Sequence, residues 1–299
     1  MQPHDYSVIT ITHYLSQHMF VSLQQMGGDL GPEQGTEAWF ARRKHKMTGS
    51  KPANIMFDCT SQEDWNRLHD EFFGNAEREP FNEEQQGFVD WGSKHEDTAV
   101  EELIRRLPNT IVYETSIIDH PAYDWLAASP DGYIVRVDDI SKTEPIVVER
   151  AALEIKCPLS KYKHDPFKMN ELMKKKRAPP YYYMSQIHFE MVMLGCTTTY
   201  FYMWTPVRSH LWKLSFDHAY WIQTVAVLDA FRRKNIPWAV MKAHIDAWKN
   251  TSKAYANRHK PIAEWDHRPP PSPHTPLSSS NAFQELSHAD QELLHRLYK

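Results

Sequence analysis

The sequence is poor in cysteine and glycine, and each shortage narrows the classes of protein to which it can belong. Its 299 residues include only 3 cysteines, Cys59, Cys157 and Cys196, which lie far apart. An odd, widely spaced set offers neither a disulfide framework nor a zinc-ligand spacing, and it favours reduced thiols in the cytoplasm or nucleus. The 10 glycines stand beside 10 tryptophans, 14 tyrosines and 13 phenylalanines, which indicates a packed enzyme body rather than a flexible scaffold.

Long apolar runs and a strong net charge are also missing. No apolar stretch approaches the roughly 20 residues that a membrane span needs. The N-terminus lacks a basic region followed by an apolar core, so we expect neither a secretory signal nor a membrane protein. The formal net charge is −4, so any surface for nucleic acid must be local. A composition of 41% hydrophobic and 24% charged residues is ordinary for a globular protein.

Apolar periodicity predicts helices, then a run of strands, then helices again. This order indicates a mixed α/β (α+β) core with a central sheet flanked by helices. The predicted helices cover residues 1–25, a segment that opens at Thr36 and Glu37, a short one through 55–57, one from Ser61, and 88–107, 181–194, 218–234 and 238–256, with a loop at 75–87. The predicted strands cover residues 111–113, 125–127, 133–137, 146–148, 153–156, 197–204 and 211–216.

The same patterns predict one domain followed by a tail. The domain covers residues 1–260, with a core at about 36–216 and a helical C-terminal extension to about 260. Residues 261–282 are rich in proline and serine, which indicates an extended linker. Residues 283–299 have the pattern of a short amphipathic helix. Such a helix is marginal alone, so we expect it to dock on its own body or on a partner.

Two carboxylates and a lysine fall on segments predicted to be neighbouring strands. Asp131 precedes Gly132 at the start of one strand, and strand alternation places Glu154 and Lys156 on the same face of another. Ile155 points into the core, although its carbonyl can face a cation. Carboxylate-held Mg²⁺ or Mn²⁺ activates water and neutralises phosphoryl charge, and two ions do so better than one. The pattern therefore predicts metal-dependent phosphodiester cleavage, with Lys156 orienting the attacking water.

Each of these residues also has an ordinary explanation. An Asp and a Glu-x-Lys pattern occur together by chance in many chains, but charges within apolar strands are costly unless they are used or paired. Glu96, on the 88–107 helix, is either a third metal-side carboxylate or a solvent-facing charge. Gln186, on an apolar helix, either holds the water or Lys156, or is a satisfied core amide.

Arg43, Ser50 and a basic run are further candidates for contacts to phosphate groups. Arg43 and Ser50 bracket a helix end, where a guanidinium and backbone N–H groups suit a phosphate. The alternative is a surface arginine beside a helix N-cap. The basic run at residues 174–177 is a contact to a nucleic-acid backbone, a nuclear-type signal or a solvated loop.

Together these residues resemble the bacteriophage lambda exonuclease family, also called YqaJ-type viral recombinases, of the PD-(D/E)xK nuclease superfamily. The resemblance runs from about Trp39 to Pro206, over half of the chain. Its motifs occur in the family's order: Trp39-x3-Arg43 with Thr48-Gly49-Ser50, then Gly92-x3-Glu96-x2-Ala99, Ser129-Pro130-Asp131-Gly132, Glu154-Ile155-Lys156-Cys157-Pro158 and Tyr183-x2-Gln186. Two features depart from the family, namely a longer insert between Asp131 and Glu154 and a segment at 218–299 without a counterpart.

The resemblance implies a restriction-endonuclease-like core and a 5′-to-3′ exonuclease that degrades one strand of duplex DNA. Such an enzyme leaves 3′ single-stranded tails for recombination, repair or genome processing in a virus or prophage, inside the cytoplasm or nucleus of a host cell. The implied catalytic residues are Asp131, Glu154, Lys156, Gln186 and Glu96. The implied ligands of two Mg²⁺ or Mn²⁺ ions are Asp131, Glu154, the Ile155 carbonyl and Glu96. The implied 5′-phosphate pocket consists of Arg43, Ser50 and Ser129.

The resemblance also implies partners and leaves two alternatives. Its partners are duplex DNA ends, further copies of the chain in a ring-shaped trimer, and a single-strand annealing protein. The first alternative is an endonuclease or an RNA-acting nuclease of the same superfamily, which the metal site also suits. The second is a non-catalytic nucleic-acid-binding module, against which the complete set of Asp131, Glu154 and Lys156 argues.

Overall fold

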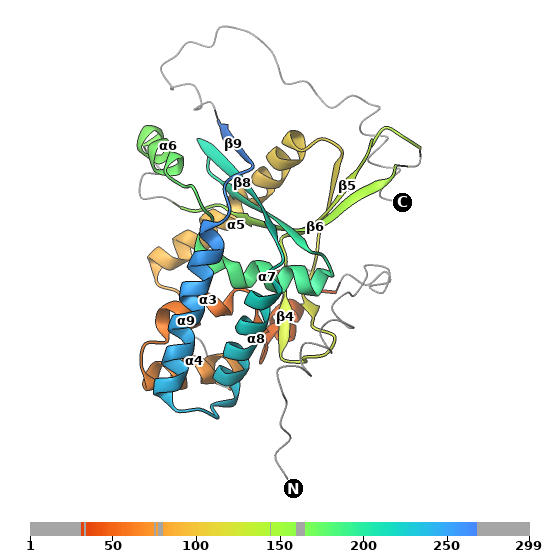
Figure 1. Cartoon of the computed structure of the whole chain (residues 1–299). Coiled ribbons are helices and arrows are strands. Elements are labelled where there is room, and N and C mark those ends of the chain that lie inside the picture. The colour runs from red at the N-terminus through yellow and green to blue at the C-terminus, as the bar shows by residue number, and fades with distance from the viewer. Residues whose placement is uncertain are drawn as a thin grey trace. The chain divides into compact units, whose positions relative to one another are not determined.

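A six-stranded mixed sheet forms the centre of the protein (Figure 1). In spatial order its strands are β2 (Thr110–Tyr113), β5 (Gly132–Val137), β6 (Val147–Lys156), β7 (Thr198–Trp204), β8 (Arg208–Ser215) and β9 (Ala263–Asp266). The computed structural model describes residues 31–32, 34–74, 76, 80–143, 145–159 and 165–267. The helices predicted at 1–25 and 283–299 lie outside these residues.

Neighbouring strands of this sheet run antiparallel except β6 and β7, which run parallel. A parallel pair needs a crossover, and α7 (Met184–Leu194) lies within it. Ten of its eleven residues are buried, so α7 is enclosed on all sides, as expected of a helix within a core. It ends at Gly195, whose φ of 63° lies in the left-handed region that glycine adopts without a Cβ clash.

Helices cover both faces of the sheet, as the sequence predicts. One hydrophobic cluster joins Ala99 and Leu103 to Leu153 and Ile155 of β6, and a second joins the opposite face to α7 and the helices behind it. Figure 1 shows α7, α8 and α9 on one side of the sheet. The helices are α2 (Glu37–Arg43), α3 (Lys51–Asp58), α4 (Gln62–Phe73), α5 (Glu83–Arg106), α6 (Pro166–Lys174), the 3-10 turn η2 (Tyr181–Tyr183), α7, α8 (His218–Arg233) and α9 (Trp238–Asn257). No helix in the described part of the chain is both long and apolar enough to cross a membrane.

A second, three-stranded sheet lies beside the first. It consists of β1 (Met47–Thr48), β4 (Leu126–Ala128) and β3 (Ile118–Asp119) in that order. The sequence predicts a strand at 125–127 but not that it belongs to a separate sheet. Because β1 and β4 pair in parallel with Thr48 opposite Ala127, the segment after α2 lies next to the segment that leads into Ser129.

The structure differs from the sequence prediction at four places. Residues 263–266, expected in a linker from 261, form β9, which pairs with β8, and the compact unit extends to His267. Helix α5 begins at Glu83 within the expected 75–87 loop, because Asn82 and Gln85 form a capping box there. The strands expected at 146–148 and 153–156 are one continuous strand, β6, and α6 was not predicted.

Candidate active site

The register of β5 and β6 brings Asp131 beside the end of β6. Gly132 pairs with Leu153, so Asp131, one residue earlier, lies next to Glu154 and Ile155. The backbone N–H of Ile155 donates a hydrogen bond to Oδ2 of Asp131 at 2.7 Å. This bond fixes the carboxylate and leaves its second oxygen available. Strands β5 and β6 form an antiparallel hairpin, which holds Asp131 beside Glu154.

Glu154 and Lys156 share one strand face, as strand alternation predicts, and form an ion pair. Oε1 of Glu154 also accepts a hydrogen bond of 2.6 Å from Nε2 of Gln186 on α7. The amide of Gln186 therefore holds the carboxylate of Glu154 rather than Lys156 itself. Glu154 is fully buried, and its Oε2 has no hydrogen-bond partner among the described residues. The ammonium of Lys156 lies 5.3 Å from the centre of the Tyr183 ring, a cation–π distance.

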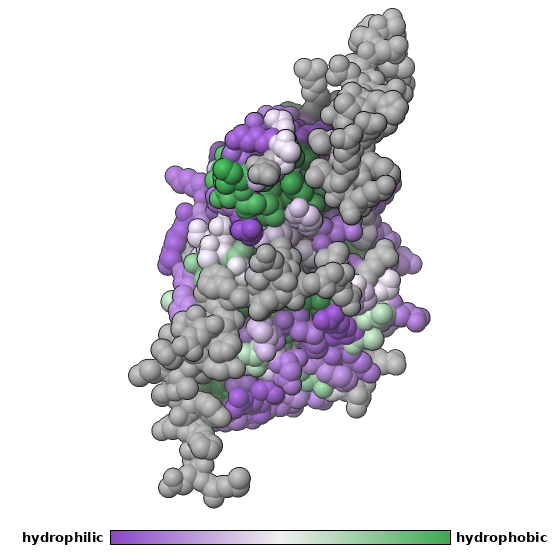
Figure 2. Space-filling model, turned by 90° about the vertical axis from the view of Figure 1, so that its right-hand side faces the viewer, coloured by the Kyte–Doolittle hydropathy of each residue, from purple (hydrophilic) through white to green (hydrophobic). Residues whose placement is uncertain are grey.

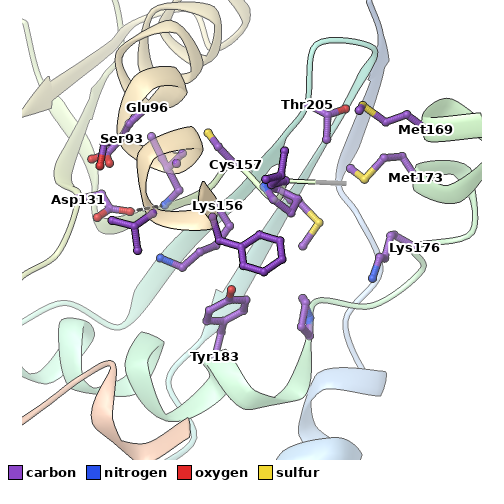
Figure 3. A pocket seen from close by; sticks show the side chains of 18 of the residues that line it. Ser93, Glu96, Asp131, Lys156, Cys157, Met169, Met173, Lys176, Tyr183 and Thr205 are labelled. Atoms are coloured by element: carbon purple, nitrogen blue, oxygen red, sulfur yellow. Dashed lines mark hydrogen bonds between the residues drawn. The ribbon is translucent and has the colours of Figure 1, made fainter. Parts of the chain in front are cut away.

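Glu96 belongs to the same site. From α5 it lines a cavity of about 620 Å³ together with Asp131 and Lys156. Figure 3 shows the Glu96 carboxylate close to that of Asp131. Burial raises the pKa of Glu96, while the charge of Lys156 opposes the shift. A carboxylate in this position is not the solvent-facing helix charge that the sequence leaves as an alternative.

Sequence reasoning missed Glu190. It lies on α7 four residues after Gln186, so both side chains are on one helix face. Glu190 is 1% exposed, and neither of its carboxyl oxygens has a hydrogen-bond donor among the described residues. Burial and then the charge of Glu154 raise its pKa well above the usual range. A glutamate four residues from a glutamine in an otherwise apolar helix was the available signal.

The site gathers more buried carboxyl groups than cationic groups. Burial and then the charge of Glu154 raise the pKa of Asp131 well above its usual value. Burial disfavours the charge of Lys156, but Glu154 and Asp131 outweigh this effect and raise its pKa well above the usual range. One lysine faces four carboxyl groups, namely Glu96, Asp131, Glu154 and Glu190.

These residues fit hard divalent cations. Unpartnered carboxylate oxygens on Glu154 and Glu190 and raised carboxyl pKa values both mark a place where added positive charge is favourable. Mg²⁺ and Mn²⁺ take such oxygen ligands. Within the described ranges, no three histidine, cysteine, aspartate or glutamate side chains are already gathered tightly enough to be ligands of one ion.

Arg43 is the centre of a second, smaller cavity of about 160 Å³. Its guanidinium donates hydrogen bonds to the hydroxyls of Ser129 at 3.0 Å, Thr48 at 3.1 Å and Ser50 at 3.4 Å. Its carbon Cζ lies 4.1 Å from the centre of the Trp39 ring. Burial lowers the pKa of Arg43 to about 10. The hydroxyl partners of Arg43 are neutral and do not balance its positive charge. A bound anion would supply the balancing negative charge.

The structure brings the three predicted phosphate residues together. Ser50 stands at the N-cap position of α3, but its side chain makes no capping hydrogen bond. Its hydroxyl is turned to Arg43 instead, so the alternative of a surface arginine beside an N-cap does not describe this site. Gly49 allows α7 to come close, since a Cβ there would lie 3.3 Å from Cγ of Gln186. Gln186 and Glu190 line this cavity too, which makes it a direct neighbour of the carboxylate site.

The core contains, in chain order, helix α5, strands β2, β5 and β6, helix α7 and strand β7. Asp131, Glu154 and Lys156 lie at the same end of the neighbouring strands β5 and β6. A core of this order with these side chains is of the PD-(D/E)xK type. Residues 38–200 match the family model described as the YqaJ-like viral recombinase domain. This match covers more than half of the chain, so the protein belongs to that family. Membership supports a nuclease that acts on DNA.

Several solved structures are similar to the chain. An alkaline exonuclease (LHK-Exo) from Laribacter hongkongensis is 22% identical, with 73% of this chain and 99% of that chain covered and a TM-score of 0.47. The same exonuclease in complex with dAMP is 23% identical, with coverage of 75% and 99% and a TM-score of 0.45. A protein titled SSO0001 is 9% identical, with coverage of 76% and 87% and a TM-score of 0.33. No curated protein matches the chain.

Proposed function

We propose that this protein is a Mg²⁺- or Mn²⁺-dependent exonuclease that degrades one strand of duplex DNA from its 5′ end. The proposal rests on one observation, namely that the Arg43 cavity adjoins the carboxylate site. Ser129, which accepts from Arg43, is two residues from Asp131, and Gln186 lines the Arg43 cavity while it donates to Glu154. A terminal phosphate bound by Arg43 therefore lies next to the bond to be cut.

The carboxylates give the proposed chemistry its metal site. Asp131 and Glu154, with the Ile155 carbonyl and Glu96, would hold the ions. Bound divalent cations supply an acidified water and neutralise the charge of the phosphoryl group. Gln186 fixes the Glu154 carboxylate through its 2.6 Å hydrogen bond. Lys156, whose pKa is raised by the charges of Glu154 and Asp131, would orient the attacking water as a charged donor.

The Arg43 cavity accounts for the proposed 5′-to-3′ direction of degradation. A terminal phosphate carries more negative charge than an internal phosphodiester and suits a guanidinium flanked by hydroxyls. Arg43, Ser50 and Ser129 therefore favour a chain end over an internal position. A site that requires a terminus releases nucleotides in steps from that end. The resulting 3′ tail suits recombination, repair or genome processing.

Digestion of labelled linear duplexes tests the metal site, the polarity and the pocket together. With Mg²⁺ or Mn²⁺ we expect loss of label from the 5′ end, faster with a 5′-phosphate than with a 5′-hydroxyl. A chelator or Lys156→Ala should abolish the loss. Lys142→Ala is the matched control, because Lys142 pairs with Asp138 in an exposed turn and is expected to leave activity unchanged. Equal activity of Lys156→Ala and wild type would refute the proposed catalytic role.

Two further substrates separate the alternatives. A covalently closed circle has no end and should resist digestion, and its rapid linearisation would instead identify an endonuclease. An RNA duplex of the same sequence should be degraded more slowly than DNA, and the reverse order would identify an RNA-acting nuclease. Binding of DNA without turnover in Mn²⁺ would support a non-catalytic module.

The proposal includes self-association, a ring-shaped trimer by family resemblance, with a single-strand annealing protein as a partner. Exposed apolar side chains at the outer end of the β5–β6 hairpin support a protein interface: Ile140, Ile146, Val147 and Val148. Figure 2, which views the molecule from the side of that hairpin, shows hydrophobic residues gathered in its upper half. Light scattering of the purified protein tests the assembly, and a monomer at all concentrations would contradict it. The proposed place of action is the cytoplasm or nucleus of a host cell during growth of a virus or prophage.

A further inference from the structure

The basic run at the end of α6 divides into members with different surroundings. Lys174 pairs with Glu171 at 2.8 Å, and Arg177 pairs with Glu264 at 3.4 Å. Lys175 is exposed. Lys176 is half-buried, lines the 620 Å³ cavity that holds Asp131 and Lys156, and forms no ion pair with a carboxylate of the described residues. Only Lys176 of this run faces the catalytic site.

The position of Lys176 is fixed by the fold. Its backbone N–H donates to the carbonyl of Met173 at 2.9 Å, which closes the turn that follows α6. Met169 and Met173, which are 2% and 3% exposed, anchor α6 in the protein. Asn170 on the same helix accepts a 2.9 Å hydrogen bond from Arg208 of β8. The ammonium therefore belongs to a packed wall of the cavity and not to a solvated loop.

The cavity has a negative end and a positive end. Figure 3 shows Asp131 and Glu96 at one end, Lys156 between, and Lys176 at the other. The walls near the rim include apolar and aromatic side chains, among them Phe88, which is 47% exposed, and Leu172, which is 42% exposed. Such surfaces suit sugars and base faces, and the carboxylate end suits cations rather than phosphate. A phosphate that lies in this cavity beyond the carboxylate end finds its counter-charge at Lys176.

We propose that Lys176 binds a phosphate of the degraded strand on the 3′ side of the bond that is cut. This inference rests on the proposed function, which puts the terminal 5′-phosphate at Arg43 and the scissile phosphate at Asp131 and Lys156. The strand continues from there into the larger cavity, because Asp131 and Lys156 line that cavity while Arg43 and Ser129 line the smaller one. Lys176 then holds the strand in line after each nucleotide has been released.

Equilibrium binding tests Lys176 without cleavage. Wild type, Lys176→Gln and the matched control Lys175→Gln are titrated in chelator against a labelled duplex with a 5′-phosphate, over a series of KCl concentrations. A lost phosphate contact should weaken binding by about three- to tenfold, the range of a partly exposed charge-assisted contact. It should also reduce the slope of log affinity against log salt by about 0.7 to 0.9. Lys175→Gln should keep the wild-type slope, and equal slopes for both variants would overturn the inference.

A substrate series assigns the phosphate. Each duplex carries one neutral methylphosphonate, placed in turn at the phosphates that follow the cut bond. At one position in the degraded strand, the methylphosphonate should weaken DNA binding by the wild type as much as the Lys176→Gln substitution does. At that position it should not weaken DNA binding by the Lys176→Gln variant any further. An effect confined to the complementary strand would overturn the strand assignment. Failure of the wild type to degrade duplex DNA would refute the proposed function instead, so the two failures are distinguishable.

Discussion

Arg43 joins three parts of the chain that sequence spacing alone leaves separate. It contacts Ser50 at the start of α3, Thr48 on β1 and Ser129 after β4. Parallel pairing of β1 with β4 brings these hydroxyls to one guanidinium. The arrangement turns an arginine and three hydroxyls, none of them informative alone, into a place for a dianion.

Replacement of Arg43 by alanine should remove the preference for a 5′-phosphate. The rate on the 5′-phosphorylated duplex is expected to fall about 10- to 100-fold, since hydrogen bonds to charged groups contribute about 1.5 to 3 kcal/mol. The rate on the 5′-hydroxyl duplex should change little. The matched control is Arg42→Ala, whose guanidinium pairs with Asp119 at 3.3 Å on the protein surface. A variant at Arg43 that keeps the preference for a phosphorylated end would contradict the assignment.

Individual residues differ in how far sequence could predict their surroundings. The pairing of Asp131 with the end of β6 was predictable, because a hairpin and strand alternation suffice to place it. Glu190 was not, because α7 is buried all round and its sequence pattern does not show which side faces the site. Lys176 was singled out only as one of four basic residues, since the pairing of Lys174 and Arg177 with carboxylates requires the tertiary structure.

Among the elements, α7 was predicted well and the strands less so. The apolar run from Tyr181 to Leu194 has helical spacing and a glycine after it, which are local signals. Strands β1 and β3 have two residues each and show no period at all. Strand β9 follows a helix and precedes a proline-rich run, so its pairing with β8 depends on contacts across more than 50 residues of sequence, such as that of Arg208 with Glu264.

Helix α7 also makes stability depend on pH through His188. Its ring is fully buried, with Nδ1 donating to the Met184 carbonyl at 2.7 Å and Nε2 accepting from the Asp217 N–H at 3.1 Å. Burial lowers its pKa to about 4. The folded pKa lies below the unfolded value of about 6.5, so the contribution of neutral His188 is complete above pH 6.5 and is lost as the pH falls through about 4.

Urea unfolding at pH 7 and pH 4.5 measures this dependence. We expect the wild type to lose about 2 kcal/mol more of its free energy of unfolding than His188→Gln over this interval. His188→Gln should already be less stable at pH 7, because it lacks the bond to Met184, yet it should respond less to acid. The control is His259→Gln, since the ring of His259 lies just beyond α9 and is half-buried, with contacts to the carbonyl and the ring of Tyr255. Equal acid responses of wild type and His188→Gln would contradict the assignment.

For the whole molecule, composition predicts that any surface for DNA is local rather than global. The chain has a net charge of −4, yet Arg43, Lys156 and Lys176 all line the two cavities. The mixed sheet flanked by helices followed from the order of periodic segments. The division into two sheets and the extent of the domain did not, because both depend on pairings between distant short strands.

Removal and addition of metal should therefore change the stability of the entire fold. Asp131 and Glu190 have raised pKa values in the folded state, so without metal their contribution is complete at low pH and is lost as the pH rises through the folded values. Mg²⁺ or Mn²⁺ bound to the folded protein reverses this loss. At about 100 times the dissociation constant it should stabilise the fold by about 2.7 kcal/mol. The gain should be larger at pH 8 than at pH 6, because protons compete for the same oxygens.

Thermal unfolding with and without metal measures this gain, and two variants on β6 locate it. Glu154→Gln should abolish the rise in Tm, because it removes a charged ligand at the centre of the site. Glu149→Gln, on the same strand, breaks an ion pair of 2.7 Å with Lys213 away from both cavities. It should lower the starting Tm and keep the metal-dependent rise. A rise of equal size in both variants would show that the ions bind elsewhere, and no rise in the wild type would show that the carboxylates of the folded protein do not bind them.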